Sequence, residues 1–229
     1  MTDYITVAEL KVDIDKTLPD DDASLAILVT AASHAIDTYC NRPDGFVALA
    51  VATARYYVGS GKPWQEIDEC TAVTALDVKD SPTDDETDYI AWVVGTVGVT
   101  AAADVFPATG APQYPEYNRT PYTLLICGGN GEYSLFTSGR LGLSDTDAPR
   151  GVPTVKVTAK WGYATTCPAQ IAKACGMQTA RWYKRLQSGM SDTLASGELG
   201  QLMYTQKLDP DVEMILRLGR FVRPVVPRL

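Results

Sequence analysis

The chain has 229 residues, of which 45% are apolar and 21% are charged, and these proportions exclude a disordered chain. Its net charge of −8 disfavours strong binding to nucleic acid. The longest uncharged apolar stretch, residues 89–103, is too short to span a bilayer, so we expect no membrane partner.

The first long helix is predicted over residues 21–40. Three aspartates at 20–22 favour its N-terminus, and the turn sequence at 41–45 ends it. Apolar residues recur at helical spacing and form its predicted core face. These are Leu25, Leu28, Val29, Ala32, Ile36 and Tyr39.

Residues 46–163 form the predicted β-rich part of the chain. Short runs of β-branched and aromatic residues alternate there with turn signals, which indicates a β-sandwich or a barrel-like domain. The proline-rich segment 107–121 is predicted to be a long loop. The predicted strands are 52–58, 73–79, 88–94, 122–127, 132–136 and 155–161.

A second long helix is predicted over residues 168–188, with Pro168 in its first turn. Four residues align on one face at 3.6-residue spacing and complete the predicted helical core: Ile171, Cys175, Trp182 and Leu186. Residues 188–207, which contain glycines and serines, are predicted to be a linker.

The last helix is predicted from about residue 210 to 222, with Asp209 as N-cap and Pro210 in its first turn. It is apolar nearly all round, so a second protein or its own subunit must cover it. One side is predicted to carry Met214, Leu218 and Phe221, and another Val212, Ile215 and Val222.

One of these two stripes is predicted to dock to a partner, and four arginines would favour an acidic rim on that partner: Arg217, Arg220, Arg223 and Arg228. The alternative is a helix that folds back and buries both stripes in its own subunit.

The order of these elements predicts an α+β fold: a small helical bundle of residues 1–45 and 164–229, with residues 46–163 as a large inserted β-rich domain. The charge is divided between the two parts of the sequence. Residues 1–150 carry 9 Lys and Arg against 23 Asp and Glu, whereas residues 151–229 carry 11 against 5. This asymmetry suggests two surfaces with different electrostatic partners.

The sequence contains no recognisable catalytic set. His34 is the only histidine, and no motif supplies the partners of a triad. The segment 59–63 fails as a phosphate loop because Pro63 stands where a Ser or Thr is needed. The acidic run at 80–88 lacks the residue order of a calcium loop. We therefore expect no enzyme activity, no cofactor and no metal.

Several short patches resemble a known family. They are Tyr39-Cys40-Asn41-Arg42, Arg55-Tyr56-Tyr57, Ile67-Asp68, the stretch from Val157 to Tyr163, the helix residues Pro168, Ile171, Ala174, Gln178, Arg181, Tyr183 and Arg185, and residues 208–212. With the order of elements, these patches resemble the head–tail adaptor (connector) proteins of tailed bacteriophages. Residues 80–150 match nothing in that family.

The resemblance implies a structural virion protein that forms a ring of about twelve copies beneath the portal protein. The ring would extend the DNA channel, through which the genome passes without sequence-specific contacts, and would dock a tail-completion or stopper protein. The expected location is the virion neck, and the host cytoplasm during assembly.

Two alternatives stay open. A tail-completion or tail-terminator ring protein would share the acidic, non-enzymatic character. A carbohydrate-binding β-domain or a hydrolase would need an aromatic cleft with paired carboxylates.

Overall fold

The computed structural model describes residues 2–15, 21–85, 87–100, 102–128, 133–139, 151–187, 193–194, 202–203 and 208–223. The chain divides into two compact units. Residues 1–46 and 167–229 form the helical unit, and residues 47–166 form the β unit. The predicted α+β fold class, a helical bundle with a large β-rich insert, is confirmed.

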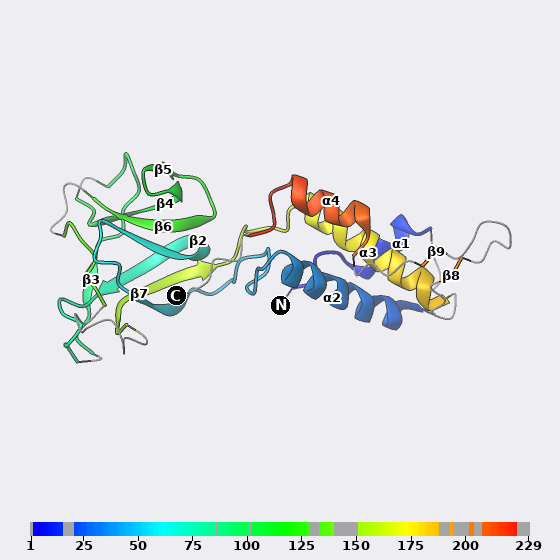
Figure 1. Ribbon diagram of the computed structural model, residues 1–229, viewed down its shortest axis with the longest axis horizontal. Coiled ribbons are helices and arrows are strands. Elements are labelled where there is room, and N and C mark those ends of the chain that lie inside the picture. The colour runs from blue at the N-terminus through cyan, green and yellow to red at the C-terminus, as the bar shows by residue number, and fades with distance from the viewer. Residues whose placement is uncertain are drawn as a thin grey trace. The chain divides into compact units, whose positions relative to one another are not determined.

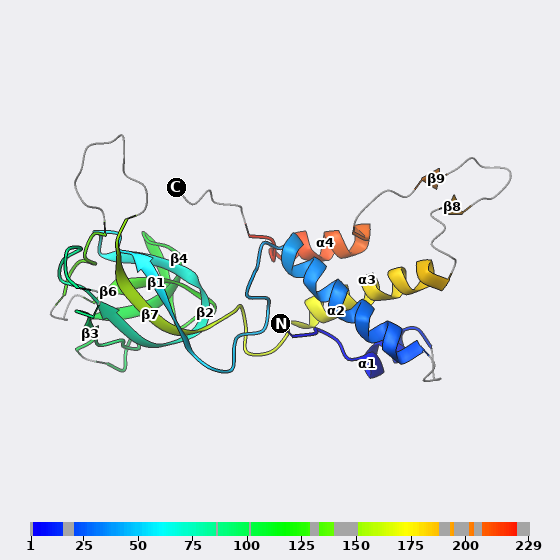
Figure 2. The ribbon, with the colours of Figure 1, turned by 90° about the horizontal axis from the view of Figure 1, so that it is seen from below.

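The helical unit contains α1 (Val7–Asp13), α2 (Asp22–Tyr39), α3 (Ala169–Gln187) and α4 (Pro210–Leu218). Helices α2, α3 and α4 lie side by side in both views (Figure 1 and Figure 2). The segment predicted as a linker includes two short strands, β8 (Thr193–Leu194) and β9 (Leu202–Met203), which pair antiparallel. The rest of that segment lies outside the described residues.

Helix α1 is short, and side-chain contacts define its ends. Thr6 and Glu9 form a capping box at its N-terminus. The Lys11 ammonium lies 2.6 Å from the Asp22 carboxylate on α2, and Lys173 on α3 lies 2.9 Å from Asp13. These ion pairs link α1 to both long helices.

Helices α2 and α3 run antiparallel, because Ser33 contacts Cys175 near their middles while Tyr183 donates to Asp21 at the start of α2. Most predicted core residues are fully buried: Leu25, Val29, Ala32, Ile36, Ile171 and Cys175. Leu28, Tyr39 and Trp182 are half-buried.

Leu186 departs from the predicted core, since it is 43% exposed. Its spacing places it on the core face of α3, but the N-terminal end of α2 does not extend far enough to cover it. Tyr183 already contacts Asp21, the N-cap of α2, so Leu186 lies almost one turn beyond the partner helix. Periodicity assigns a face but not the length of the element packed against it.

The β unit is one antiparallel sheet built from β1 (Thr53–Val58), β2 (Trp64–Val78), β3 (Ile90–Trp92), β4 (Val105–Ala111), β5 (Tyr114–Tyr117), β6 (Tyr122–Cys127) and β7 (Pro153–Trp161). The strand order is β1-β7-β2-β6-β4-β5, and β3 pairs with β2. Among the described strands, β1, β3 and β5 each pair with one strand only and are the edges. The sheet is therefore open and does not close into a barrel.

The sheet buries one face around a core of apolar side chains: Ile67, Cys70, Leu76, Val78, Trp92, Val105, Leu125, Phe136, Val155, Val157, Ala159 and Trp161. Strand β2 is much longer than the predicted strand 73–79. Its register shifts between Glu66 and Cys70 and again before Ala75. Such irregularities break the alternation from which a strand is recognised in a sequence.

The predicted loop 107–121 is wrong, because it contains most of β4 and all of β5, which form a hairpin between Ala111 and Tyr114. Pro115 is tolerated because it lies on β5, an edge strand of the sheet. The predicted strand 132–136 is also wrong over the described residues 133–136, which form no strand. Phe136 nevertheless reaches the core.

Four residues from three strands form a polar cluster against the core. The Arg55 guanidinium lies 2.9 Å from the Asp68 carboxylate and 4.5 Å from the ring centroid of Trp161. Tyr57 Oη donates to the same carboxylate at 3.0 Å. The cluster joins β1, β2 and β7, and it collects residues from three of the patches on which the family resemblance depends.

The predicted helical core contains both buried and exposed residues, and substitutions at one of each test the packing of α2 on α3. Ile36→Ala should destabilise the helical unit by about 2–5 kcal/mol, because it empties a fully buried site. Leu186→Ala should change stability by about 0.5 kcal/mol or less, because this residue is already in solvent. Urea unfolding followed by circular dichroism at 222 nm measures both. Equal losses would show that α3 is covered along its whole length.

Candidate functional site

The candidate site is α4 together with the residues that follow it. Asp209 caps the helix by accepting from Asp211 N, and Pro210 occupies the first turn. The helix ends at Leu218, four residues before its predicted end. Arg220 then adopts a φ of 54°, in the left-handed region, and turns the chain back toward the helical unit.

One side of α4 is buried in its own subunit. Val212 and Leu216 are fully buried, and Phe221 packs edge-to-face on Phe46 with ring centroids 5.6 Å apart. Arg42 Nε donates to the carbonyl oxygen of Phe221 at 2.9 Å. The backbone N–H of Arg223 donates to the carbonyl oxygen of Cys40 at 3.1 Å. These contacts hold the segment 210–223 on the end of α2.

The opposite side of α4 stays uncovered. Met214 is 52% exposed, Leu218 is 77% exposed, and Val222 is exposed beyond the helix end. Ile215 is half-buried between the two sides. We call Met214, Leu218 and Val222 the outer stripe.

The structure regroups the predicted stripes. Phe221, predicted beside Met214 and Leu218, is buried with Val212, whereas Val222 joins the exposed side. The left-handed turn at Arg220 changes the direction in which the following side chains point. Helical spacing continued past Leu218 therefore could not predict which sides Phe221 and Val222 would face. Leu216 is the buried residue that the predicted stripes omitted.

The four predicted arginines have different surroundings. Arg217 forms an ion pair with Glu213, and its Nε donates to Tyr39 Oη at 3.0 Å. Arg220 is exposed, and Arg223 is half-buried. Arg228 lies outside the described residues. Positive charge therefore borders the exposed end of α4.

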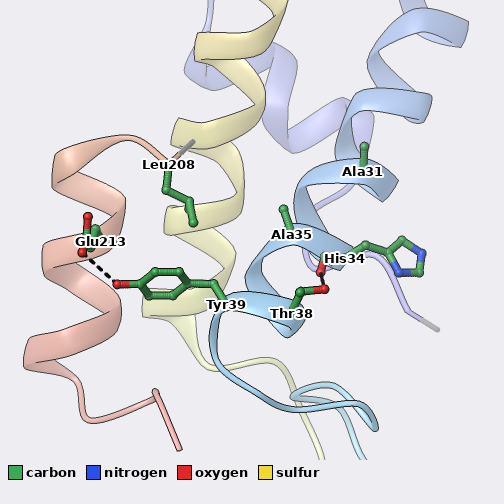
Figure 3. A pocket seen from close by; sticks show the side chains of 7 residues that line it. All are labelled: Ala31, His34, Ala35, Thr38, Tyr39, Leu208 and Glu213. Carbon is green, nitrogen blue, oxygen red and sulfur yellow. Dashed lines mark hydrogen bonds between the residues drawn. The ribbon is translucent and has the colours of Figure 1, made fainter. Parts of the chain in front are cut away.

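A pocket of about 650 Å³ opens between α2 and α4. Its lining residues are Ala31, His34, Ala35, Thr38, Tyr39, Leu208 and Glu213. Figure 3 shows Tyr39 reaching across to Glu213, to which its hydroxyl donates at 2.9 Å, while His34 points away from α4. Ala31 and Ala35 have small side chains that leave this space open. The hydrogen bond between Tyr39 and Glu213 bounds the pocket at one end.

A second pocket, of about 280 Å³, lies at the C-terminal end of α2 and includes Asp37 and Arg42 in its lining. Asp37 is buried and accepts a hydrogen bond from Tyr4 Oη, which in turn accepts from the backbone N–H of Phe46 at 2.8 Å. Burial raises the pKa of the Asp37 carboxyl above its usual value, although the bond from Tyr4 and the nearby Arg42 charge oppose the shift.

The described residues offer little for catalysis. No group of three or more His, Cys, Asp or Glu side chains among them is placed to hold a metal ion. Burial raises the pKa of the Cys40 thiol to about 11 and that of Cys70 to about 12, which keeps both protonated at neutral pH. His34 is exposed and lines both pockets.

None of the helices in the described ranges is long and apolar enough to cross a bilayer.

The chain was also compared with known proteins. No family model and no curated protein matches it. Among solved structures, it is similar to a chain described as the neck of an empty GTA particle computed with C6 symmetry. The identity is 16% and the TM-score is 0.48, over 99% of this chain and 94% of that chain. A likeness of this degree leaves function to be argued from the residues themselves.

The raised pKa of Asp37 predicts a pH dependence. An acid whose pKa is higher in the folded state favours folding below its unfolded pKa, and this contribution is lost as the pH rises through the folded value. From about pH 4, near the ordinary aspartate pKa, to about pH 7, the wild type should therefore lose stability relative to Asp37→Asn. Urea unfolding of both proteins across this range measures the difference. A difference that stays constant with pH would contradict the assignment.

Proposed function

We propose that the chain is a head–tail adaptor subunit of a tailed bacteriophage or a related particle. It would assemble with copies of itself into a ring beneath the portal protein, and DNA would pass through the ring without base-specific contacts. The proposal is supported by the family-like patches around residues 39–42, 55–57 and 157–163 and by the lack of a recognisable catalytic set in the sequence.

One observation carries the docking part of the proposal: α4 is fixed on its own subunit by one side and leaves an apolar stripe in solvent on the other. A helix held in this way is preorganised, so a partner that binds the outer stripe does not have to order it. The stripe can enter an apolar groove as an amphipathic helix does.

The charge at the end of α4 indicates the character of that groove. Arg217 and Arg220 border Leu218 and are both exposed. An acidic rim on the portal protein would attract them and orient the helix, while the apolar contact supplies the affinity. We therefore propose the outer stripe of α4 as the surface that docks to the portal.

Leu218→Asp tests this surface without disturbing the fold, because Leu218 is already exposed. The variant should unfold at the wild-type temperature and should lose at least about 90% of its ability to join DNA-filled heads, since a charge would enter the apolar contact. Assembly with purified tailless heads, scored by particles that retain DNA and accept tails, measures the loss.

Leu186→Asp is the matched control, because it places the same charge on another exposed leucine of the helical unit. Normal head completion by Leu218→Asp and Met214→Asp would end the docking proposal. Binding to the far end of purified tails instead of to heads would favour a tail-terminator ring. Deleting residues 209–229 is a poorer test, because it also removes the buried Val212, Leu216 and Phe221.

A further inference from the structure

The start of α4 is bonded to two polar side chains of α3. Asp209, the residue that precedes α4, donates its backbone N–H to the Oε1 atom of Gln178 at 3.0 Å. Its carboxylate lies 3.0 Å from the Arg181 guanidinium. Gln178 and Arg181 are three residues apart on α3, so their side chains are neighbours on the helix surface. We call Gln178, Arg181 and Asp209 the α4 clamp.

The Asp209 carboxylate has two partners at once. Its Oδ1 atom accepts from the backbone N–H of Asp211 and caps the helix, while its Oδ2 atom accepts from Arg181. The Asp209 carbonyl also accepts from the N–H of Glu213 at 2.9 Å, in the first turn of the helix. One residue therefore begins α4 and joins it to α3, so the ion pair with Arg181 also orients the cap.

The clamp is largely buried, which increases its effect on the position of the chain. Gln178 is 1% exposed, and an amide buried to this degree is costly unless it is hydrogen-bonded. The side chains of Arg181 and Asp209 are 19% and 25% exposed, so solvent screens this ion pair less than it screens a surface pair. These contacts favour the observed position of residue 209.

Apolar packing holds the two ends of the α4 segment unequally. The buried Phe221 anchors the far end. At the start, Val212 is fully buried, but the 650 Å³ pocket separates α2 from Leu208 and Glu213 (Figure 3). Side chains that line an unfilled space lack dispersion contacts on that side. Resistance to movement of the start of α4 toward α2 must therefore come from the clamp and from the Tyr39–Glu213 hydrogen bond.

Helix α4 depends on such anchors because it has only nine residues. Isolated helices shorter than about 12–15 residues are marginally stable in water. Met214 lies four residues after Pro210, whereas Leu218 lies at the end nearer to Phe221. Loss of the clamp would therefore displace Met214 more than Leu218.

We propose that Gln178 and Arg181 are positioning residues for the outer stripe. Through Asp209 they hold the first turns of α4 in the orientation that presents Met214 to a partner. Gln178 is buried and Arg181 largely so, and they act through Asp209 without touching the partner. This inference rests on the proposed docking function and adds to it a control of the docking surface by α3.

Three variants separate the ion pair from the cap. Arg181→Met removes the positive charge, Asp209→Asn keeps a good N-cap without the negative charge, and Arg181→Lys keeps the positive charge. In the free full-length protein, the first two should speed hydrogen exchange of the α4 amides 213–218 at least about threefold. Arg181→Lys should keep most of the protection. The double variant Arg181→Met with Asp209→Asn should exchange no faster than either single variant, because both changes remove the same pair.

Lys173→Met is the matched control, because it breaks the other ion pair of α3, the one with Asp13 on α1. It should leave the exchange of α4 unchanged. In every variant the amides of residues 25–36 in α2 should keep their wild-type exchange, which separates a local loosening of α4 from a loss of the fold. Joining to purified tailless heads, measured beside Leu218→Asp, should fall at least about threefold in Arg181→Met and Asp209→Asn and stay normal in Lys173→Met.

The exchange and the head-joining results distinguish failure of the clamp from failure of the docking proposal. Unchanged α4 exchange in Arg181→Met, or equally fast exchange in Arg181→Lys, would overturn the clamp whatever the heads show. Faster exchange with normal joining would overturn the positioning role if Leu218→Asp still abolishes joining. Normal joining by Leu218→Asp as well would instead remove the docking proposal, and the positioning role with it.

Discussion

The hydrogen bond from Arg42 to the carbonyl of Phe221 is the contact on which the placement of the C-terminal end of α4 depends most. Arg42 is buried, and its guanidinium also lies 5.0 Å from the ring centroid of Phe46. A buried guanidinium is costly unless its donors are used, so the bond from Nε favours the observed position of Phe221. Phe221 can reach its site only after the turn at Arg220, and that turn ends α4 at a fixed place. The exposure of Leu218 follows from this geometry.

The same end of the helical unit also receives the N-terminus. Tyr4 donates its backbone N–H to Ser33 Oγ, and its hydroxyl lies between Asp37 and the N–H of Phe46. Gly45 must be a glycine there, because its φ is 74° and a Cβ would lie 2.8 Å from Tyr4 Oη. Three segments that are distant in the sequence are therefore fixed around the C-terminal end of α2. This arrangement makes α2 a rigid support for α4.

Sequence periodicity predicted the helical unit well, because its helices are long and each is packed on one face. Helices α2 and α3 begin and end within about two residues of their predicted limits. The β unit was harder to predict. Strand β2, the longest, contains register shifts. The β4–β5 hairpin contains prolines, which are more typical of loops. The fold class could therefore be predicted, but the path of the strands could not.

The candidate site was only partly predictable, and the reason is physical. The sequence shows that the last helix is apolar all round, but which stripe is covered depends on Phe46 and Arg42, nearly 180 residues earlier. The uncharged, exposed side of α2 went unnoticed for a related reason. A helix is recognised in a sequence by its apolar face. The lack of charge on the other face of α2 is informative only once those side chains are known to be exposed.

The exposed sides of α2 and α4 differ in their side chains. The outer stripe of α4 has large apolar side chains with cations beside them, so it complements an acidic partner and repels a copy of itself. The exposed side of α2, which includes Ile27, Ala31 and His34, has mostly small side chains, and no charged residue stands between Asp22 and Asp37. Met214 and Leu218 do not line the pocket between α2 and α4, whereas Glu213 does. A partner could therefore engage the outer stripe of α4 without entering this pocket, and the contact would not require the helices to rearrange.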